Sequence, residues 1–383
     1  MRTYKLLSPF PVREVYESGL RSLAAGDYGA AQLAAESLSI ESVDPSYKSV
    51  LEGGIELRLG RLEQAVALLE PALKFPDTAP LAHTFTGEVL YKSHQFGAAI
   101  QVLKQAVKLD DSMVDAHRWL SASYYDIGAT GPTVKELMKV SELSPTDPRP
   151  HRLAGLIYKD MESYDAAINE YRESLRRSTD FPNRNAVLRE LAECLLKAGR
   201  HEELDEILEQ CPAEPLTLTF AAESKHARGD SQGARRLVNQ VLEAAPNHLS
   251  ALLLKATLEV EASEAAEAVK TLLTAAKLHP FESRVYYQLS QAYTRTGEPE
   301  LAEKNNAEST RLRDLRAHFT DLHAQASENL DNAEIRFQLG STARELGLNE
   351  LAVSWLSAAL AIDPMHSQAA AELKAITKQS NSN

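Results

Sequence analysis

The sequence contains few of the features on which many protein functions depend. Only two of its 383 residues are cysteines, Cys194 and Cys211, which cannot supply a disulfide framework or a four-thiolate zinc site. We expect both thiols to be buried and inert. No apolar run reaches the roughly 18 residues that a membrane-spanning helix needs, and the first residues lack the apolar core of a secretory signal. These absences predict a soluble, cytoplasmic protein with no membrane span.

Positive charge and aromatic residues are also scarce. The chain carries 41 Lys and Arg against 54 Asp and Glu, a formal net charge of −13. Nucleic acids and anionic membranes favour basic surfaces, because binding releases counterions, so we expect no nucleic-acid partner. Hydrophobic residues make up 44% of the sequence and aromatic residues only 6%. A core is therefore expected, but one in which small and aliphatic side chains do most of the packing.

Patterns for catalysis, metals and phosphates are missing as well. His201-Glu-Glu-Leu-Asp lacks the second histidine of a metalloprotease helix, and His318 and His323 are five residues apart, off a common helical face. The segment Gly128-Ala-Thr-Gly-Pro-Thr has no lysine for a phosphate loop and is typical of a turn. We therefore expect no enzymatic activity, no cofactor and no metal.

What the sequence does contain is a repeat of 34 residues, visible in two columns of small side chains. The first column is Gly19, Gly53, Gly87, Ser121 and Gly155, and the second, twelve places later, is Ala31, Ala65, Ala99, Thr133 and Ala167. After a slip near residue 181, the columns resume with Ala222, Ala256 and Ser290, and with Ala234, Ala268 and Ala302. Two columns in one register indicate a repeat architecture.

Each repeat has the pattern of two helices joined by a tight turn. Segments such as Ala25-Gly-Asp and Leu59-Gly-Arg lie between the columns, and glycine can end a helix while the next polar residue caps the following one. Apolar residues recur at three and four places on both sides, which is helical spacing. Small residues let the two antiparallel helices approach closely, and each pair must bury its remaining apolar face on the next pair.

This pattern resembles the tetratricopeptide repeat (TPR) family. The fifth repeat carries the family motif in Leu153-Ala-Gly155, Tyr158, Ala167 and Tyr171, and further matches are Gly87 to Ala106, Ala268 to Pro280, and Leu339-Gly340 with Ala352, Leu356, Ala359 and Pro364. The resemblance implies an all-α, right-handed α-α superhelix (TPR solenoid) of about ten helix-turn-helix repeats. We expect repeats to begin near Val12, Ser46, Pro80, Val114, Pro148, Asn185, Pro215, Leu249, Ser283 and Ala333.

This spacing suggests a division of the chain. We expect a lead-in at 1–11, repeats one to five at 12–181, repeats six to nine at 182–314, a helical extension at 315–332, the tenth repeat at 333–364, and a cap helix with a frayed tail at 365–383. Pro71 lies within the expected second helix of repeat two and predicts a kink there, because proline cannot donate a backbone hydrogen bond.

One irregularity has two interpretations. Residues 301–330 contain no glycine or proline, and an apolar stripe runs along them at three-four spacing: Leu312, Leu315, Phe319, Leu322 and Ala326. The stripe either forms a docking or dimerisation helix, which makes a homo-oligomer possible, or belongs to a lengthened second helix that covers its own stack.

The family resemblance also indicates where a partner would bind. In the family the first helices line a concave groove, so groove-facing positions are the second, fifth, ninth, twelfth and thirteenth of each repeat. Arg118, Arg152 and Arg189 stand at the fifth position of successive repeats. Nearby groove residues are Arg149, Lys159, Lys92, Tyr91 and Tyr125, with Trp119 beside them. We predict that these nine residues form a locally positive peptide-binding groove, with the net negative charge on the convex face and the ends.

Arginine can hold a carboxylate through two parallel hydrogen bonds, so the predicted partner is a protein or peptide with an acidic or C-terminal segment. Alternatively, these cations pair with neighbours such as Asp115, Asp126, Asp160 and Glu193 and contribute little more than local stability. The predicted function is a non-catalytic scaffold or adaptor. The alternatives are a homo-oligomeric assembly module that uses residues 312–326, a regulatory subunit of an enzyme, and an enzyme with residues drawn from separate repeats.

Overall fold

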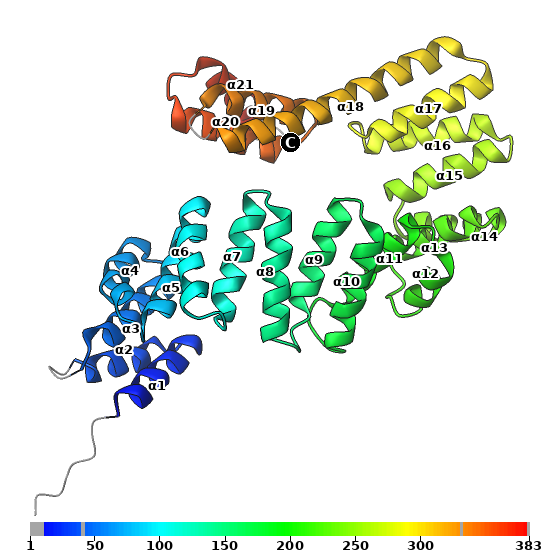
Figure 1. Ribbon diagram of the computed structural model, residues 1–383. Coiled ribbons are helices and arrows are strands. Elements are labelled where there is room, and N and C mark those ends of the chain that lie inside the picture. The colour runs from blue at the N-terminus through cyan, green and yellow to red at the C-terminus, as the bar shows by residue number, and fades with distance from the viewer. Residues whose placement is uncertain (1–10, 40–42, 330–331, 381–383) are drawn as a thin grey trace, which may run out of the picture. The chain divides into compact units, whose positions relative to one another are not determined.

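The computed structural model describes residues 11–39, 43–329 and 332–380, and every regular element in those ranges is a helix. The chain divides into two compact parts, an N-terminal half (Met1–Cys194) and a C-terminal half (Leu195–Asn383). Helices α1 to α20 follow one another as ten successive first and second helices of a repeat, and α21 comes last (Figure 1). The all-α repeat architecture expected from the sequence is confirmed.

The N-terminal half contains repeats one to five and most of the first helix of repeat six. Its first helices are α1 (Val12–Ala24), α3 (Pro45–Arg58), α5 (Ala79–Lys92), α7 (Val114–Asp126), α9 (Arg149–Asp160) and α11 (Arg184–Lys197), in which the boundary between the halves lies. Its second helices are α2 (Tyr28–Ser37), α4 (Leu62–Leu69) with the 3-10 turn η1 (Glu70–Lys74), α6 (Phe96–Leu109), α8 (Thr130–Leu143) and α10 (Tyr164–Arg177).

The C-terminal half contains the remaining repeats. Its first helices are α13 (Pro215–Ala227), α15 (Leu249–Glu261), α17 (Ser283–Thr296) and α19 (Ala333–Glu345). Its second helices are α12 (His201–Leu208), α14 (Ser231–Ala244), α16 (Ala265–Leu278), α18 (Pro299–Glu328) and α20 (Asn349–Ile362), and α21 (Ser367–Ser380) packs on α20. Every first helix begins within one residue of the start expected from the sequence.

The turns and small-residue columns explain why the helices pair. Seven glycines at the turns adopt positive φ angles, among them Gly26 at 78° and Gly229 at 84°. Within the first helices, glycine allows close approach, because a Cβ atom on Gly87 would lie 2.4 Å from Leu103 of the second helix, and one on Gly155 would lie 2.7 Å from Tyr171. A larger residue at either position would push the two helices apart.

Pro71 lies in a 3-10 segment that follows the α-helix, and not within one continuous bent helix. Helix α4 ends at Leu69, and the 3-10 turn η1, which contains Pro71, begins at Glu70. Proline removes one backbone donor and clashes with the preceding turn, so a short 3-10 segment is a low-cost continuation. The sequence analysis predicted a kink in the second helix here, and the structure instead ends the α-helix at Leu69 and continues in 3-10 geometry.

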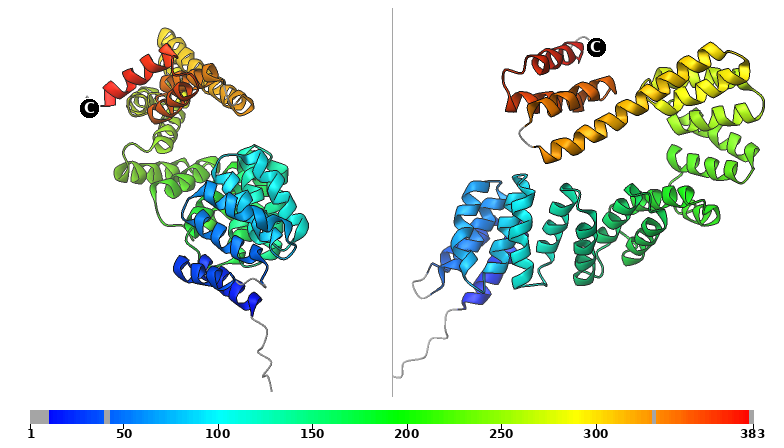
Figure 2. Two further views of the ribbon diagram at one scale, coloured as in Figure 1. Left: turned by 90° about the vertical axis from the view of Figure 1, so that its left-hand side faces the viewer. Right: turned by 45° about the horizontal axis from the view of Figure 1, so that its top comes forward.

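Helix α18 is a lengthened second helix of 30 residues that contacts α17 and then α19 (Figure 2). Leu312 and Leu322 of its apolar stripe are buried. Phe319 packs with residues of α19 and α20, and Leu315 is partly buried. The stripe thus covers the protein's own stack, as the second interpretation of the sequence expected. The boundary suggested between residues 314 and 315 falls inside this helix.

Candidate functional site

The structure pairs most of the predicted groove cations with carboxylates. On α5, Lys92 lies 2.9 Å from Glu88, which also contacts Arg58. On α9, the Nε and Nη2 atoms of Arg152 donate to Glu190 at 3.1 and 2.8 Å, and Lys159 Nζ donates to Glu193 at 3.1 Å. Arg189 is partly buried on α11.

A second ionic cluster joins α7 to the loop before α9. The guanidinium of Arg118 donates to Asp115 at 2.9 Å and to Asp147 at 3.1 Å, and Arg149 donates to Asp147 through Nε and Nη2. Burial alone would raise the pKa of Asp147, but the hydrogen bonds from Arg149 and the charge of Arg118 outweigh it and hold the pKa below its usual value.

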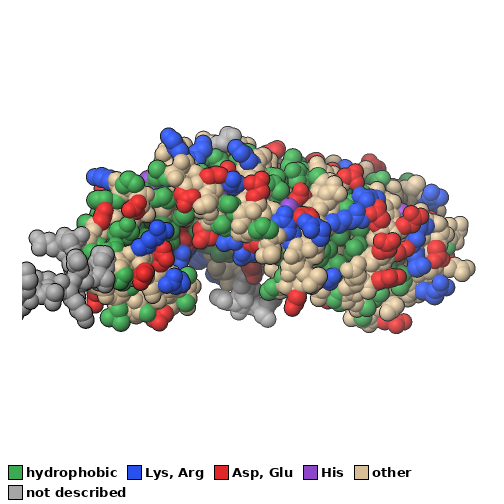
Figure 3. All heavy atoms as spheres, turned by 60° about the horizontal axis from the view of Figure 1, so that its bottom comes forward, with side chains coloured by type: hydrophobic (Ala, Val, Ile, Leu, Met, Phe, Trp, Pro, Cys, Tyr) green, Lys and Arg blue, Asp and Glu red, His purple; other side chains and the backbone are tan. Residues whose placement is uncertain are grey.

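The carboxylates offset much of the positive charge that the sequence suggested for this groove. Asp115 and Glu193 are among the partners that the alternative interpretation named, whereas Glu88, Asp147 and Glu190 were not foreseen. Figure 3 shows the same mixture more widely, with Lys and Arg side chains interspersed among Asp and Glu on the face it presents.

The predicted aromatic residues divide into a packed pair and an exposed ring. The rings of Tyr91 and Trp119 lie with their centroids 5.1 Å apart, a contact between repeats three and four. Burial and a hydrogen bond to Asp126 raise the pKa of Tyr91 to about 12. Tyr125, one repeat after Tyr91, is instead 53% exposed.

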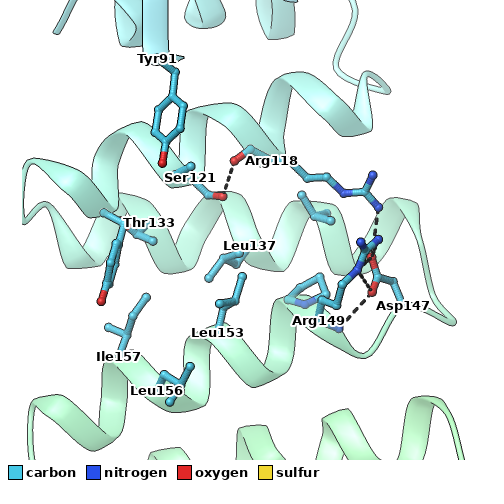
Figure 4. Close-up of a pocket in the computed structure, with 14 residues that line it drawn as sticks. Tyr91, Arg118, Ser121, Thr133, Leu137, Asp147, Arg149, Leu153, Leu156 and Ile157 are labelled. Carbon is cyan, nitrogen blue, oxygen red and sulfur yellow. Dashed lines mark hydrogen bonds and ion pairs between the residues drawn. The ribbon is translucent and has the colours of Figure 1, made fainter. Parts of the chain in front are cut away.

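An apolar pocket of about 380 Å³ lies between repeats four and five and brings several predicted residues together. Its apolar wall is formed by Leu137 and Val140 of α8 and by Leu153, Leu156 and Ile157 of α9, with Tyr91 and Tyr125 also lining it. Figure 4 shows Arg118, Asp147 and Arg149 at one end, Tyr91 at the other and the leucines between them. Of the predicted groove residues, Arg118, Tyr91, Tyr125 and Arg149 therefore share one site.

The hydroxyl groups of Ser121 and Thr133 in this pocket are satisfied within the protein. The Ser121 hydroxyl donates to the Arg118 carbonyl at 2.7 Å, and the Thr133 hydroxyl donates to the Ala129 carbonyl at 2.9 Å. The pocket therefore offers apolar contact over most of its surface and charged donors at one end only.

The C-terminal half has a hollow of its own, of about 690 Å³, lined by residues of α13, α15 and α17 and by the end of α11. Its lining is more polar. Gln288 Nε2 donates to Thr257 at 3.2 Å, while Gln288 Oε1 makes no hydrogen bond within the described chain. Tyr287 is half exposed beside it. The sequence analysis proposed no site here.

Sequence comparisons decide the family. One tetratricopeptide repeat model matches residues 50–113, 152–203 and 253–308, a second matches 333–366 and a third matches 215–240, together more than half of the chain. The chain belongs to the tetratricopeptide repeat family. A search of curated proteins found no match.

The chain is also similar to several solved structures, at low sequence identity. MamA AMB-1 is 22% identical with a TM-score of 0.37, and the match covers 42% of this chain and 86% of that one. Pseudomonas aeruginosa pilF is 19% identical with a TM-score of 0.41, covering 55% and 97%. A structure of Naa15/Naa10 bound to HypK-THB is 13% identical with a TM-score of 0.47, covering 97% and 66%.

Other chemistry is sparse in the part of this TPR protein that the structure describes. Across these residues no cluster of His, Cys, Asp or Glu is placed to hold a metal. None of the described helices is both long and apolar enough to cross a membrane. Cys194 is buried, and burial followed by the charge of Glu193 raises its pKa to about 12, so this thiol is not a ready nucleophile. Cys211 is partly buried.

Sequence reasoning identified the two ends of the TPR pocket but not its wall. Leu137, Val140 and Leu156 look like ordinary core residues of amphipathic helices. Leu153 shares a 34-residue column with Leu51 and Phe85, which predicts burial and not the exposure that the structure shows. Nothing in the sequence indicates that the contact normally made in this column is missing in repeat five.

Proposed function

We propose that this TPR protein is a non-catalytic scaffold that binds a segment of a protein partner on the side of α5, α7 and α9 where the apolar pocket opens. The observation that carries the proposal is that Tyr125 and Leu153, which line one pocket, are 53% and 47% exposed. Burying such side chains is a main source of affinity at protein interfaces.

The charged end of the pocket supports the finer proposal that the segment is acidic or ends in a carboxylate. Side chains of Arg118 and Arg149 are 38% and 68% exposed although both contact Asp147. Arg149 uses Nε and Nη2 for that contact, and its Nη1 makes no hydrogen bond to any described residue. Arginine can therefore contact Asp147 and an incoming carboxylate at once.

Crosslinking in cells, with the full chain as bait, tests the proposal. We expect the double variant Tyr125→Ser/Leu153→Ser to capture about tenfold less of these proteins than the native chain does, because two large side chains no longer contribute buried area at the interface. The matched control is Leu33→Ser/Leu278→Ser, which changes two residues that are 65% and 47% exposed outside the pocket.

The two variants must first show the helical content and thermal midpoint of the native chain. The proposal is contradicted if the Tyr125/Leu153 variant captures the same proteins in the same amounts as the control. It is also contradicted if the native chain captures only other copies of itself, which would favour the homo-oligomeric alternative.

A further inference from the structure

We propose that the pocket between α7 and α9 is a socket for one bulky apolar side chain of the partner, and that an acidic residue close to it in the partner sequence pairs with Arg149. This inference rests on the proposed function and names the chemistry of the segment that binds. The observation behind it is a contact between repeats that is made elsewhere in the N-terminal half and absent here.

The sixth position holds a large apolar residue in six of the ten repeats, and Leu51 and Phe85 pack at this position against Gly19 and Gly54 of the preceding repeat. Leu51, Phe85, Phe220 and Leu254 occupy this column at intervals of 34 residues on each side of the slip near residue 181. All four are buried, with exposures of 8% or less. Leu153 occupies the same column in repeat five but is 47% exposed. Leucine is also found at this position in other repeats, so the greater exposure of Leu153 comes from its surroundings and not from its residue type.

A comparison of two successive junctions identifies what is missing. At the junction of repeats three and four, the rings of Tyr91 and Trp119 pack with their centroids 5.1 Å apart and their planes tilted by 47°, and both residues are partly buried. One repeat later the equivalent residues are Tyr125 and Leu153, which both line the pocket and are both about half exposed. The backbones of α5 and α7 approach to within 8 Å between Cα atoms, whereas those of α7 and α9, each described in full, do not.

An apolar side chain from a partner would complete this junction. The pocket of about 380 Å³ is at the small end of the range typical of ligand sites, which suits one large side chain with part of its backbone rather than a helix. Its hydroxyl groups on Ser121 and Thr133 already donate internally, so the occupant gains most by being apolar.

The charged groups at the end of the pocket determine which type of partner residue can lie next to the apolar side chain. Asp147 is only 10% exposed and is already held by two guanidinium groups, so it cannot readily accept a lysine from the partner. Arg149 projects further into solvent and keeps Nη1 available. Charge complementarity therefore favours an aspartate, a glutamate or a terminal carboxylate near the apolar residue.

Selection from a displayed library of random ten-residue peptides against the full chain tests the inference. We expect enriched peptides to carry Phe, Leu, Met or Trp with an acidic residue within four positions. Replacing the apolar residue by alanine should weaken binding at least about tenfold, the effect of removing a large buried side chain. Replacing the acidic residue by its neutral amide should weaken binding severalfold and reduce its salt dependence.

Filling the socket provides the decisive variant. Ala122 lines the pocket on α7 and is partly buried, so Ala122→Phe places a ring inside it without removing any existing contact. The control is Ala324→Phe on α18, where the alanine is exposed and lines neither hollow described above. We expect Ala122→Phe to weaken the selected peptides at least tenfold and to keep the native thermal midpoint, while the control binds normally.

The outcomes separate this inference from the proposed function. Peptides without the apolar-acidic pattern, or peptides that bind Ala122→Phe as well as the native chain, would overturn the socket while leaving protein binding on this side intact. A library that contains the pattern but yields no enriched peptide also contradicts the socket. Capture of the same proteins in the same amounts by the Tyr125→Ser/Leu153→Ser variant and its control would contradict the proposed function instead.

Discussion

At the scale of single residues, two glycines of repeat three show how position decides the effect of the same substitution. A Cβ atom added to Gly87 would lie 2.4 Å from Leu103 Cγ, but one added to Gly97 would have no neighbouring atom within 4 Å. We expect Gly87→Ala to destabilise the protein by about 1–3 kcal/mol through overpacking. Gly97→Ala should be neutral or stabilise it by up to about 1 kcal/mol, because alanine favours helix.

Urea denaturation monitored by helical circular dichroism measures both changes. Equal effects of the two variants, in either direction, would show that the helices of repeat three are not packed as closely as the structure places them.

His117 provides a second prediction at the same scale, because it is a buried histidine between two acidic side chains. Its Nδ1 atom lies 2.6 Å from Glu136, and Nε2 lies 3.1 Å from the Asp111 carbonyl and 3.5 Å from the Asp111 carboxylate. Lys139, which contacts Asp111, is the neighbouring cation. Burial opposes protonation, but these hydrogen bonds and charges outweigh it, and the pKa of His117 is raised.

A folded-state pKa above the unfolded value makes protonation of His117 stabilising. This contribution is fully present below the unfolded pKa of about 6.5 and is lost as the pH rises through the higher folded value. We expect the urea midpoint of the native chain to fall between pH 6 and pH 8.5 by more than that of His117→Gln. The comparison isolates this residue, because burial lowers the pKa of His83 and His248 in both proteins. Identical pH profiles for the two proteins would contradict the prediction.

At the scale of elements, α18 combines two roles that ordinary second helices do not. Its first part pairs with α17, and its later part supplies Phe319 and Leu322 to the core shared with α19 and α20. The turn between α19 and α20 also meets the loop before α17, since a Cβ atom on Gly347 would lie 2.2 Å from the ring of Phe281.

The variant Leu322→Ala distinguishes the two interpretations of the α18 stripe. Leu322 is 2% exposed, and removing it from a packed core should cost about 2–5 kcal/mol of stability. If the stripe belongs to the protein's own core, light scattering should give the same molar mass for the native chain and the variant. A native dimer that Leu322→Ala converts into a monomer of unchanged stability would favour the dimerisation helix. The exposed neighbour Ala324→Ser serves as the control.

At the scale of the whole molecule, the repeat period predicted far more of the fold than of the site. The two columns of small residues, to which Gly53 and Ala65 belong, recur because the two helices of every repeat must pack closely. One sequence pattern therefore locates all the first helices. The socket depends on a departure from that regularity. Leu153 has the residue type expected at its position, yet it is 47% exposed where the backbones of α7 and α9 stay more than 8 Å apart between Cα atoms.

The charges could not be predicted fully for a related reason. The arginines at positions 118 and 152 are visible in the sequence, but Arg118 also bonds Asp147, 29 residues away, and Arg152 bonds Glu190, 38 residues away. The stacking of one repeat on the next determines which residues at such sequence separations meet. An ion pair between repeats is therefore hard to distinguish from a free cation until the stacking is known.

The same local stacking predicts that the first five repeats fold by themselves. Up to α10, the helices contact only the two elements that follow or precede them closely in the chain, apart from the short turn η1 and its neighbours. In repeat arrays of this kind, stability is a sum over single repeats and their nearest-neighbour interfaces. A chain ending at residue 182, in the loop between α10 and α11, keeps five complete pairs.

This shortened chain loses the bonds of Arg152 to Glu190 and of Lys159 to Glu193. We expect it to show helical circular dichroism and a cooperative urea transition at a lower midpoint than the full chain, because its last repeat has no following neighbour. All residues that line the socket lie between Tyr91 and Ile157, so the selected peptides should bind it within about threefold of their affinity for the full chain. A shortened chain that folds but does not bind these peptides would place the binding site elsewhere, and one without helical signal would show that repeats one to five depend on later repeats.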